Sequence, residues 1–205
     1  MPYSFLIAVT PPEKLFNEVL GIKESIKKKY GIQYATTHIP HLGLLVNSFA
    51  SFKDLDEEIK KIVSKIKPFK IEVNGVSYFA KDSVTYGTTI FVKVKKTKEI
   101  DDIHKLFLER LNHLRTNDQM KWLNYKKENF SPHLWDYVQK YGHPYVLENF
   151  LAHISIDSVK KENFENIWNK IKKYNPKLTF TAKQIDLYIW LHPDSWVLLR
   201  SYKLK

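Results

Sequence analysis

The sequence predicts an α+β fold in which helices cover mainly antiparallel β-sheet, and two observations predict it. Short apolar segments that suit strands alternate along the chain with amphipathic segments that suit helices. A strand–helix–strand–strand unit occurs in each half, which predicts two pseudo-symmetric lobes with helices on their outer faces. A chain of 205 residues can bury a core of its own, so residues 1–205 are expected to form a single bilobal domain.

The first half of the chain carries clear signals for the starts and ends of its helices. Thr10, followed by two prolines, is expected to cap a helix that ends at Gly31. Ser51 is expected to cap a second helix that closes near Pro68. The expected strands are Tyr3–Val9, Thr36–Phe49, Phe69–Phe79 and Val84–Val94, and a third helix is expected over Glu99–Arg115.

The second half begins after a stretch that breaks this rhythm. Residues 116–149 are polar and aromatic and contain Pro132, Gly142 and Pro144, so we interpret them as an insertion that packs on the body of the protein. The expected strands that follow are Phe150–Asp157, Lys177–Ala182, Gln184–His192 and Trp196–Leu204, with a helix over Lys161–Tyr174 and a turn at Pro193-Asp194-Ser195.

Composition restricts the classes of function. The formal net charge of +11 favours a polyanionic partner such as nucleic acid, although a lysine-rich solubilising surface explains it equally well. The chain has no cysteine, which excludes disulfides, thiolate metal sites and cysteine nucleophiles. No apolar run approaches the ~20 residues of a membrane span, and the N-terminus lacks signal-peptide features. We therefore expect a cytoplasmic monomer without membrane contact.

Two of the eight histidines lie within apolar strands. His41 shares a strand face with Gly43, and His153 shares one with Ser155, because positions i and i+2 point the same way. Taken singly, each is more often a structural histidine whose ring nitrogens are satisfied. Two in equivalent contexts favour a shared function. The His38–His41 spacing does not predict a metal site, because an extended chain places the two rings on opposite faces.

These segments resemble the 2H phosphoesterase superfamily, which includes 2′-5′ RNA ligase-like proteins and cyclic phosphodiesterases. Its signature is a pair of H-x-[ST] motifs on strands of two lobes that flank a central cleft. His153-Ile154-Ser155 matches the motif, and the element order resembles the family along nearly the whole chain. The segment Tyr141–Val146 is similar to members associated with phosphonate metabolism. The first motif departs from the pattern, because Gly43 stands where the family has a hydroxyl residue.

The resemblance implies acid and base catalysis by His41 and His153 on a cyclic nucleotide or a 2′,3′-cyclic or 2′-5′ linked RNA end, without metal or cofactor. It implies that Ser155, with backbone amides or lysines, binds the phosphate oxygens, and that Gly43 lies beside them. Aromatic side chains are candidates for base stacking or for ordinary packing: Tyr145, Tyr188 and Trp190.

Two other functions remain open from the sequence. A protein of the same fold could bind nucleotide or RNA but be catalytically weak or inactive, because Gly43 offers no hydroxyl. Alternatively, the basic surface could bind RNA in general, with steep salt dependence and indifference to either histidine. The sequence does not distinguish hydrolysis from ligation, and it does not assign the acid and the base.

Overall fold

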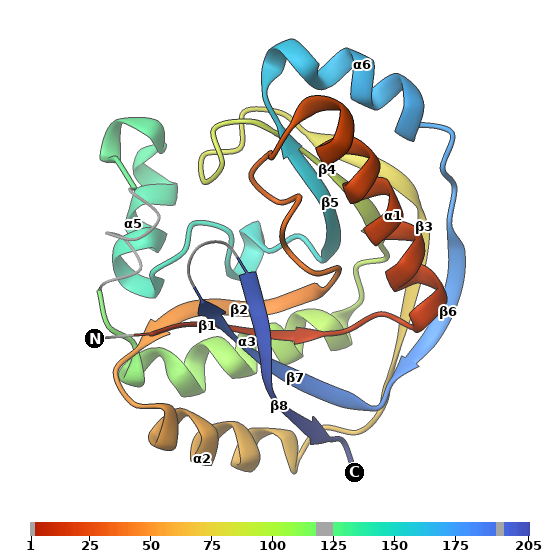
Figure 1. Cartoon of the computed structure of the whole chain (residues 1–205). Helices are drawn as coiled ribbons and strands as arrows, with labels where there is room; N and C mark the ends of the chain where they lie inside the picture. The colour runs from red at the N-terminus through yellow and green to blue at the C-terminus, as the bar shows by residue number, and fades with distance from the viewer. Residues whose placement is uncertain (1–2, 118–124, 192–194) are drawn as a thin grey trace.

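A computed structural model describes residues 3–117, 125–191 and 195–205, and eight of its strands form one curled antiparallel sheet (Figure 1). The strand order is β6-β3-β4-β5-β2-β1-β7-β8. The strands are β1 (Tyr3–Val9), β2 (Leu42–Phe49), β3 (Phe69–Phe79), β4 (Thr88–Val94), β5 (His153–Val159), β6 (Lys177–Ala182), β7 (Gln184–Leu191) and β8 (Ser195–Lys203). The predicted α+β class with mainly antiparallel sheet is confirmed.

The two lobes are two four-stranded halves of this sheet. In neither half do the strands lie side by side in the order in which they occur along the chain. One half contains β8, β7, β1 and β2, and the other contains β5, β4, β3 and β6. Each half therefore combines strands from early and late in the sequence. The halves meet where β2 pairs with β5, and within the described chain a single residue pair, Leu42 with Ile154, forms that ladder.

The helices lie mainly against one face of the sheet (Figure 1). They are α1 (Glu13–Tyr30), α2 (Phe52–Val63), α3 (Lys98–Leu111), α5 (Pro132–Tyr141) and α6 (Lys161–Ile171), with short 3₁₀ turns η1 (Asn112–Leu114), η2 (Lys127–Asn129) and η3 (Leu147–Asn149). Gly31 ends α1 with a positive φ of 76°. The predicted cap at Thr10 is wrong: Pro12 occupies the N-cap, and the Thr10 hydroxyl instead donates to Asp186 over 2.5 Å.

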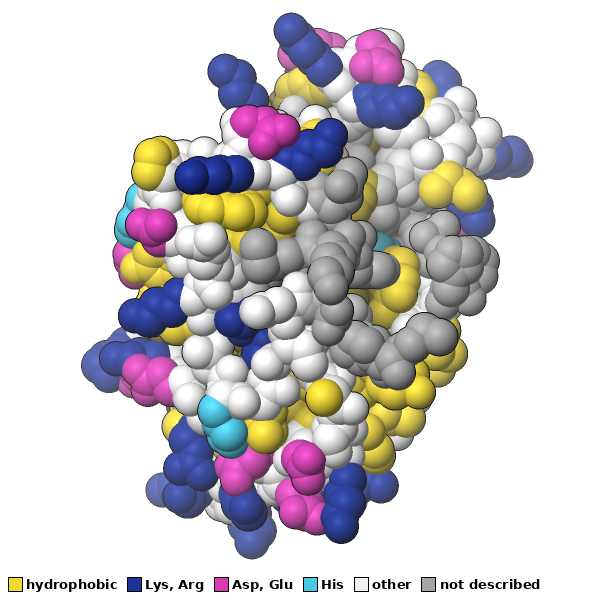
Figure 2. Space-filling model, turned by 90° about the vertical axis from the view of Figure 1, so that its left-hand side faces the viewer, with side chains coloured by type: hydrophobic (Ala, Val, Ile, Leu, Met, Phe, Trp, Pro, Cys, Tyr) yellow, Lys and Arg dark blue, Asp and Glu magenta, His cyan; other side chains and the backbone are white. Residues whose placement is uncertain are grey.

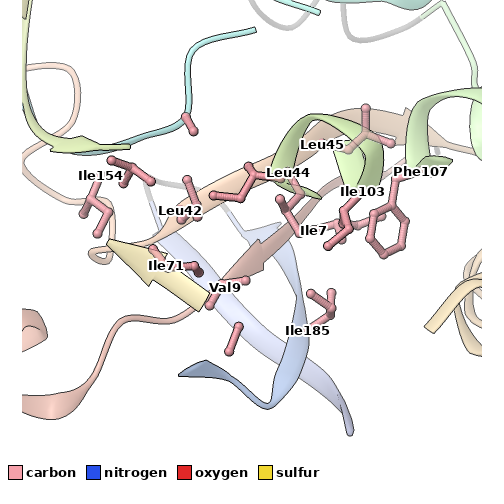
Figure 3. Packing of buried hydrophobic residues seen from close by; sticks show 14 of the residues in the cluster. Ile7, Val9, Leu42, Leu44, Leu45, Ile71, Ile103, Phe107, Ile154 and Ile185 are labelled. Carbon is pink, nitrogen blue, oxygen red and sulfur yellow. The ribbon is translucent and has the colours of Figure 1, made fainter. Parts of the chain in front are cut away.

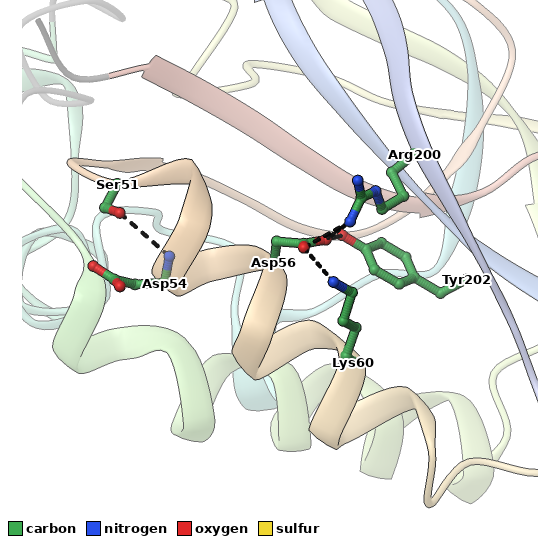
Figure 4. Close-up of polar contacts among 6 residues, drawn as sticks. All are labelled: Ser51, Asp54, Asp56, Lys60, Arg200 and Tyr202. Atoms are coloured by element: carbon green, nitrogen blue, oxygen red, sulfur yellow. Dashed lines mark hydrogen bonds and ion pairs between the residues drawn. The ribbon is translucent and has the colours of Figure 1, made fainter.

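Helix α2 is fixed at both its start and its middle (Figure 4). Ser51 caps it as predicted, because its hydroxyl accepts from the Asp54 amide over 3.2 Å. The buried Asp56 accepts from Arg200 over 2.7 and 2.8 Å and from the Tyr202 hydroxyl over 2.6 Å. A buried carboxylate requires such partners, so this cluster attaches α2 to β8.

The core lies between the helices and the sheet, and strand alternation determines which side chains enter it (Figure 3). Leu42 and Leu44 of β2 and Ile154 of β5 point into the core, where α3 contributes Ile103 and Phe107 (Figure 3). Each such side chain contributes ~1.5–3 kcal/mol on burial. The residues adjacent to these core residues along the chain, which include both histidines of the sequence motifs, therefore face the opposite side of the sheet.

Several predicted boundaries are wrong by a few residues, with local causes. The strand expected over Thr36–Phe49 begins only at Leu42, because the preceding segment forms turns with a hydrogen bond from His38 N to Ala35 O. The strand expected from Val84 begins at Thr88, because Asp82 accepts from the Val84 amide and organises a turn. The expected Phe150–Asp157 strand is displaced to His153–Val159. The expected turn at residues 193–195 falls largely outside the described residues.

His104 of α3 is a buried histidine that contacts β2 and the 3₁₀ turn η3. On an amphipathic helix a histidine is expected at the surface or on the flank, but this ring is buried and stacks on Phe150 with centroids 3.9 Å apart. Its Nδ1 donates to Leu44 O over 2.7 Å, and its Nε2 accepts from Leu147 N over 3.1 Å. Both ring nitrogens are satisfied by backbone, so His104 is a structural histidine.

Candidate active site

The two motif histidines are held by the same kind of hydrogen bond at the starts of neighbouring strands. His41 immediately precedes β2, and His153 is the first residue of β5. His41 Nδ1 donates to Ile39 O over 2.7 Å, and His153 Nδ1 donates to Leu151 O over 2.6 Å. In each case the acceptor is the carbonyl two residues earlier. A carbonyl accepts only, so the proton of a neutral ring sits on Nδ1 and Nε2 keeps its lone pair. Both Nε2 atoms are thereby available for proton transfer.

The pairing of β2 with β5 places the two motifs side by side. Leu42 pairs with Ile154 in antiparallel register, so His41 lies across from Ser155, and His153 lies across from Gly43. Each strand also carries a β-bulge three residues after its histidine, at Leu44 in β2 and at Ile156 in β5. Bulges are frequent next to active sites, where they redirect side chains.

Both motifs open into one cavity of about 480 Å³, within the range of about 300–1,000 Å³ that is typical of small-molecule sites. The residues predicted to form the site and found in its wall are His41, Gly43, Tyr145, His153 and Ser155. Most of the remaining wall is apolar or aromatic, and it includes Tyr34, Phe79, Val84, Phe150 and Trp196. This composition suits a ligand with one polar group and a flat or apolar remainder.

The charges near the two rings differ, although burial affects both. Burial lowers the pKa of His41 from 6.5 to about 4, and the charges of Lys23 and His153 act in the same direction. Burial also lowers the pKa of His153, but the carboxylate of Asp82 offsets part of that effect. The effect of His153 on the pKa of His41 is consistent with their common cavity. His153 is the one that an acidic neighbour helps to protonate.

Asp82 and Tyr145 form a fixed hydrogen-bonded unit in the cavity wall. The Tyr145 hydroxyl donates to Asp82 Oδ1 over 3.1 Å and accepts from the Ser83 amide over 2.9 Å. Asp82 Oδ2 accepts from the Thr89 hydroxyl over 2.7 Å. The hydroxyl of Tyr145 is therefore engaged, and only its ring faces are left for a ligand.

The other two predicted binding residues lie apart from the histidines. Tyr188 is buried, and its hydroxyl forms a hydrogen bond with Thr10 over 2.5 Å. Trp190 packs edge-on against Trp196 and His38, with centroids 5.1 and 5.2 Å apart. Neither is among the described residues that line the cavity, whereas Trp196 is. Their predicted role in binding remains untested.

Most of the wall was not predicted to form the site, and its unpredicted polar residues include His38, Asp82 and His143. Asp82 belongs to no motif of the sequence, and His143 lies in the Tyr141–Val146 segment that precedes the second motif. The sequence signal next to His143 is Gly142, a residue type that commonly ends helices. It ends α5 in the left-handed conformation with a φ of 79°. A Cβ at Gly142 would lie 2.5 Å from Asn47 Oδ1, so the chain passes close to β2 there.

The described residues contain no group of three or more His, Asp or Glu side chains placed to hold a metal ion. Within the same residues, no helix has the length and apolar character needed to traverse a bilayer.

Comparisons with known proteins agree on one family. A sequence model described as the 2′-5′ RNA ligase superfamily matches residues 11–194. A protein of Oceanobacillus iheyensis that is named as a phosphoesterase is 23% identical over 202 residues, which cover 97% of this chain and 96% of that protein.

Solved structures of low sequence identity share the fold. A protein of Thermus thermophilus superposes with a TM-score of 0.61 at 15% identity, over 98% of this chain and 97% of that one. Escherichia coli LigT in complex with 3′-AMP superposes with a TM-score of 0.53 at 9% identity, over 100% and 99% of the two chains.

Proposed function

Because the chain belongs to the 2′-5′ RNA ligase superfamily of 2H phosphoesterases, we propose that it hydrolyses a cyclic phosphodiester by acid and base catalysis with His41 and His153. The observation that carries this proposal is the matched orientation of the two rings. Both donate Nδ1–H to a carbonyl two residues back, and both keep Nε2 available in one cavity. Two imidazoles that flank one phosphorus atom can divide the proton transfers of phosphodiester hydrolysis.

The surrounding charges support a division of roles. His41 Nε2 accepts a proton from the attacking water, because burial and Lys23 keep this ring neutral. His153, near Asp82, donates its proton to the leaving oxygen as the phosphorus–oxygen bond breaks. The product is a phosphomonoester. The two histidines then return to their starting protonation states by exchange with solvent. These proton transfers require no metal ion.

Ser155 is placed to stabilise the charge that develops on the phosphate. It lines the cavity next to both histidines, and its hydroxyl can donate to a non-bridging oxygen. The corresponding position in the first motif, Gly43, leaves that side without a hydroxyl. A Cβ at Gly43 would meet the His41 ring at 3.8 Å, an ordinary contact, so the site has room there for substrate or for a small side chain.

Nucleotides are the substrate class that we propose. Structures of E. coli LigT, which shares this fold, are described with 3′-AMP, NADP+ and ATP. In this chain the aromatic wall, with the ring faces of Tyr145 and Tyr34, could accept a base by stacking. A cytoplasmic, monomeric enzyme is part of the same proposal.

One observation favours a second candidate function. Gly43 lacks the hydroxyl that the family pattern places there, so the protein could bind a nucleotide with little or no turnover. The deciding experiment is incubation of the protein with 2′,3′-cyclic nucleotides in the presence of EDTA, followed by separation of products. Hydrolysis that His41→Ala and His153→Ala each abolish supports the enzyme. Saturable binding without product over hours supports the binder.

A further inference from the structure

The cavity carries a charge opposite to that of the protein around it. The chain has 33 lysines and arginines and a formal net charge of +11. Yet no lysine or arginine belongs to the cavity wall as far as the structure describes the chain, and its one formally charged side chain is Asp82. On the face shown in Figure 2, basic side chains lie mainly toward the edges, and apolar and histidine side chains show in the indentation near the centre.

The histidines of the wall do not replace the missing cations. Five of the eight histidines line the cavity, at positions 38, 41, 104, 143 and 153. Burial lowers the pKa of every one of them, to about 3 for His38 and about 4 for His143. The free cavity is therefore lined by neutral imidazoles near pH 7.

The one buried lysine among the described residues is paired with a buried carboxylate. Lys23 is fully buried behind the wall, and its Nζ donates to Ala35 O over 2.6 Å. Asp157, also buried, attracts that charge, and its Oδ1 accepts from the Ala35 amide over 3.0 Å. The pair sums to zero charge and clamps the backbone of the 33–38 segment. It does not supply a free positive charge to a ligand.

Neutral donors are present in place of cations. His143 differs from the two motif histidines, because its Nδ1 accepts from the Tyr145 amide over 3.2 Å. Its proton must then sit on Nε2, which makes it a hydrogen-bond donor and not a proton acceptor. Ser155 adds a hydroxyl in the same wall. Donors of this kind can solvate one negative charge, whereas a second charge in an apolar cavity needs a cation.

From these contacts we propose that the cavity selects a phosphodiester with a single negative charge and an aromatic or apolar remainder, and that it rejects phosphomonoesters and polyphosphates. The proposal rests on the proposed function for its placement of the phosphate, and it adds the charge class of the ligand. The same property favours release of the monoester that hydrolysis would produce, because the product carries one more charge than the substrate.

The test compares two ligands that differ by one charge and resist the reaction. 2′-Deoxyadenosine 3′-phosphate and its methyl ester share base and sugar, and neither has the 2′-hydroxyl needed for a cyclic intermediate. Above pH 7 the monoester carries nearly two charges and the ester one. Titration calorimetry of the full chain is expected to show ~10- to 100-fold tighter binding of the methyl ester, since an unpaired buried charge weakens binding to that degree. Equal affinity, tighter binding of the monoester, or no binding of the diester overturns the proposal.

Matched variants test whether the lack of a cation in the wall causes the selectivity for the diester. Leu151 lines the cavity and is 42% exposed, so a lysine there can reach the ligand without burial of its charge. Leu151→Lys should strengthen monoester binding about tenfold and reduce the selectivity, whereas the neutral Leu151→Gln should not. Lys121→Gln, which removes the only lysine or arginine outside the described residues, should leave the diester affinity unchanged.

This design separates the inference from the proposed hydrolysis. Selective binding of the methyl ester by a protein that fails to hydrolyse 2′,3′-cyclic AMP would support the inference and refute the hydrolysis. Hydrolysis of 2′,3′-cyclic AMP by a protein that binds the monoester and the methyl ester equally well would support the hydrolysis and refute the inference. Loss of diester binding in Lys121→Gln would show that a cation does serve the site, and would overturn the inference.

Discussion

The two histidine strands use one backbone design in two different environments. In β2 and β5 alike, the ring is fixed by the carbonyl two residues earlier, and a bulge follows three residues later. The strands differ in the residue two positions after the histidine, which is Gly43 in one and Ser155 in the other. They also differ in the charge that shifts the pKa of the ring: Lys23 lowers that of His41, and Asp82 raises that of His153. A symmetric scaffold thus presents two equivalent rings, and their neighbours make the rings unequal. That inequality is what acid and base catalysis requires.

Removal of either ring tests whether both strands contribute. His41→Ala and His153→Ala should each lower kcat/KM for a 2′,3′-cyclic nucleotide by ~10²–10⁴-fold, because each ring transfers a proton in the proposed mechanism. Thermal melts should show that both variants remain folded. His133→Ala, at an exposed side chain of helix α5, is the control and should retain full activity. Full EDTA-resistant activity in either motif variant would refute the two-histidine mechanism.

Ser155→Gly makes the second strand resemble the first. We expect kcat to fall by ~10- to 100-fold, since a hydrogen bond to a charged group is lost in the transition state. Ser155→Thr should retain most of the activity. Steady-state kinetics on the three proteins measures this, and a Ser155→Gly variant with wild-type kcat would show that the hydroxyl has no part in the reaction.

Gly43→Ser makes the reverse change and tests whether the first strand is deficient. The added Cβ meets only ordinary contacts, at 3.6 Å from Leu6 and 3.8 Å from His41, so the fold should tolerate it. The new hydroxyl can donate to a phosphate oxygen, and kcat/KM should rise by up to about tenfold. Gly43→Ala is the matched control, because it adds the Cβ without the donor. An equal gain in both variants would attribute the effect to packing.

The pH profile of kcat/KM tests the unequal charges and carries the smallest expected effect. Activity should rise through the pKa of His41, which is about 4, because the base must be neutral. It should fall as His153 loses its proton, and burial lowers the pKa of His153 below 6.5. The optimum is therefore expected on the acidic side of 6.5.

Asp82→Asn should move the falling limb of this profile to still lower pH, because the carboxylate raises the pKa of His153. The rising limb should stay in place. Asp136→Asn, an exposed residue of α5, should move neither limb. A profile of Asp82→Asn that superposes on the wild-type profile would exclude the proposed charge assistance.

Local patterns predicted the elements well, because apolar alternation and caps are local properties. The β2 and β5 histidines were assigned to one strand face with Gly43 and Ser155 by the period of two alone, and these residues do share the cavity wall. The pairing of β2 with β5, and the exchange of strands between the lobes, could not be predicted, since alternation determines the face of a strand and not its neighbour.

The remainder of the wall depends on contacts between distant segments. Asp82 enters it because its turn packs against Tyr145, which lies 63 residues further along the chain. The tautomer of His143 depends on a single backbone amide, which no sequence pattern indicates. Tyr188, a candidate for ligand stacking or for packing, lies outside the described cavity wall and its hydroxyl bonds to Thr10, so its role in binding stays a prediction.

His104 couples acidity to the integrity of the sheet. This ring joins Leu44 O to Leu147 N, and it does so only as the neutral tautomer that donates at Nδ1 and accepts at Nε2. A proton added at Nε2 would face the Leu147 amide hydrogen, so the hydrogen bond that ties η3 to this ring would be lost. Below pH 6.5 the fold therefore loses stability as the medium acidifies toward the lowered pKa of this ring. Tolerance of the fold to acid therefore depends on this contact between β2 and η3 as well as on the histidines of the site.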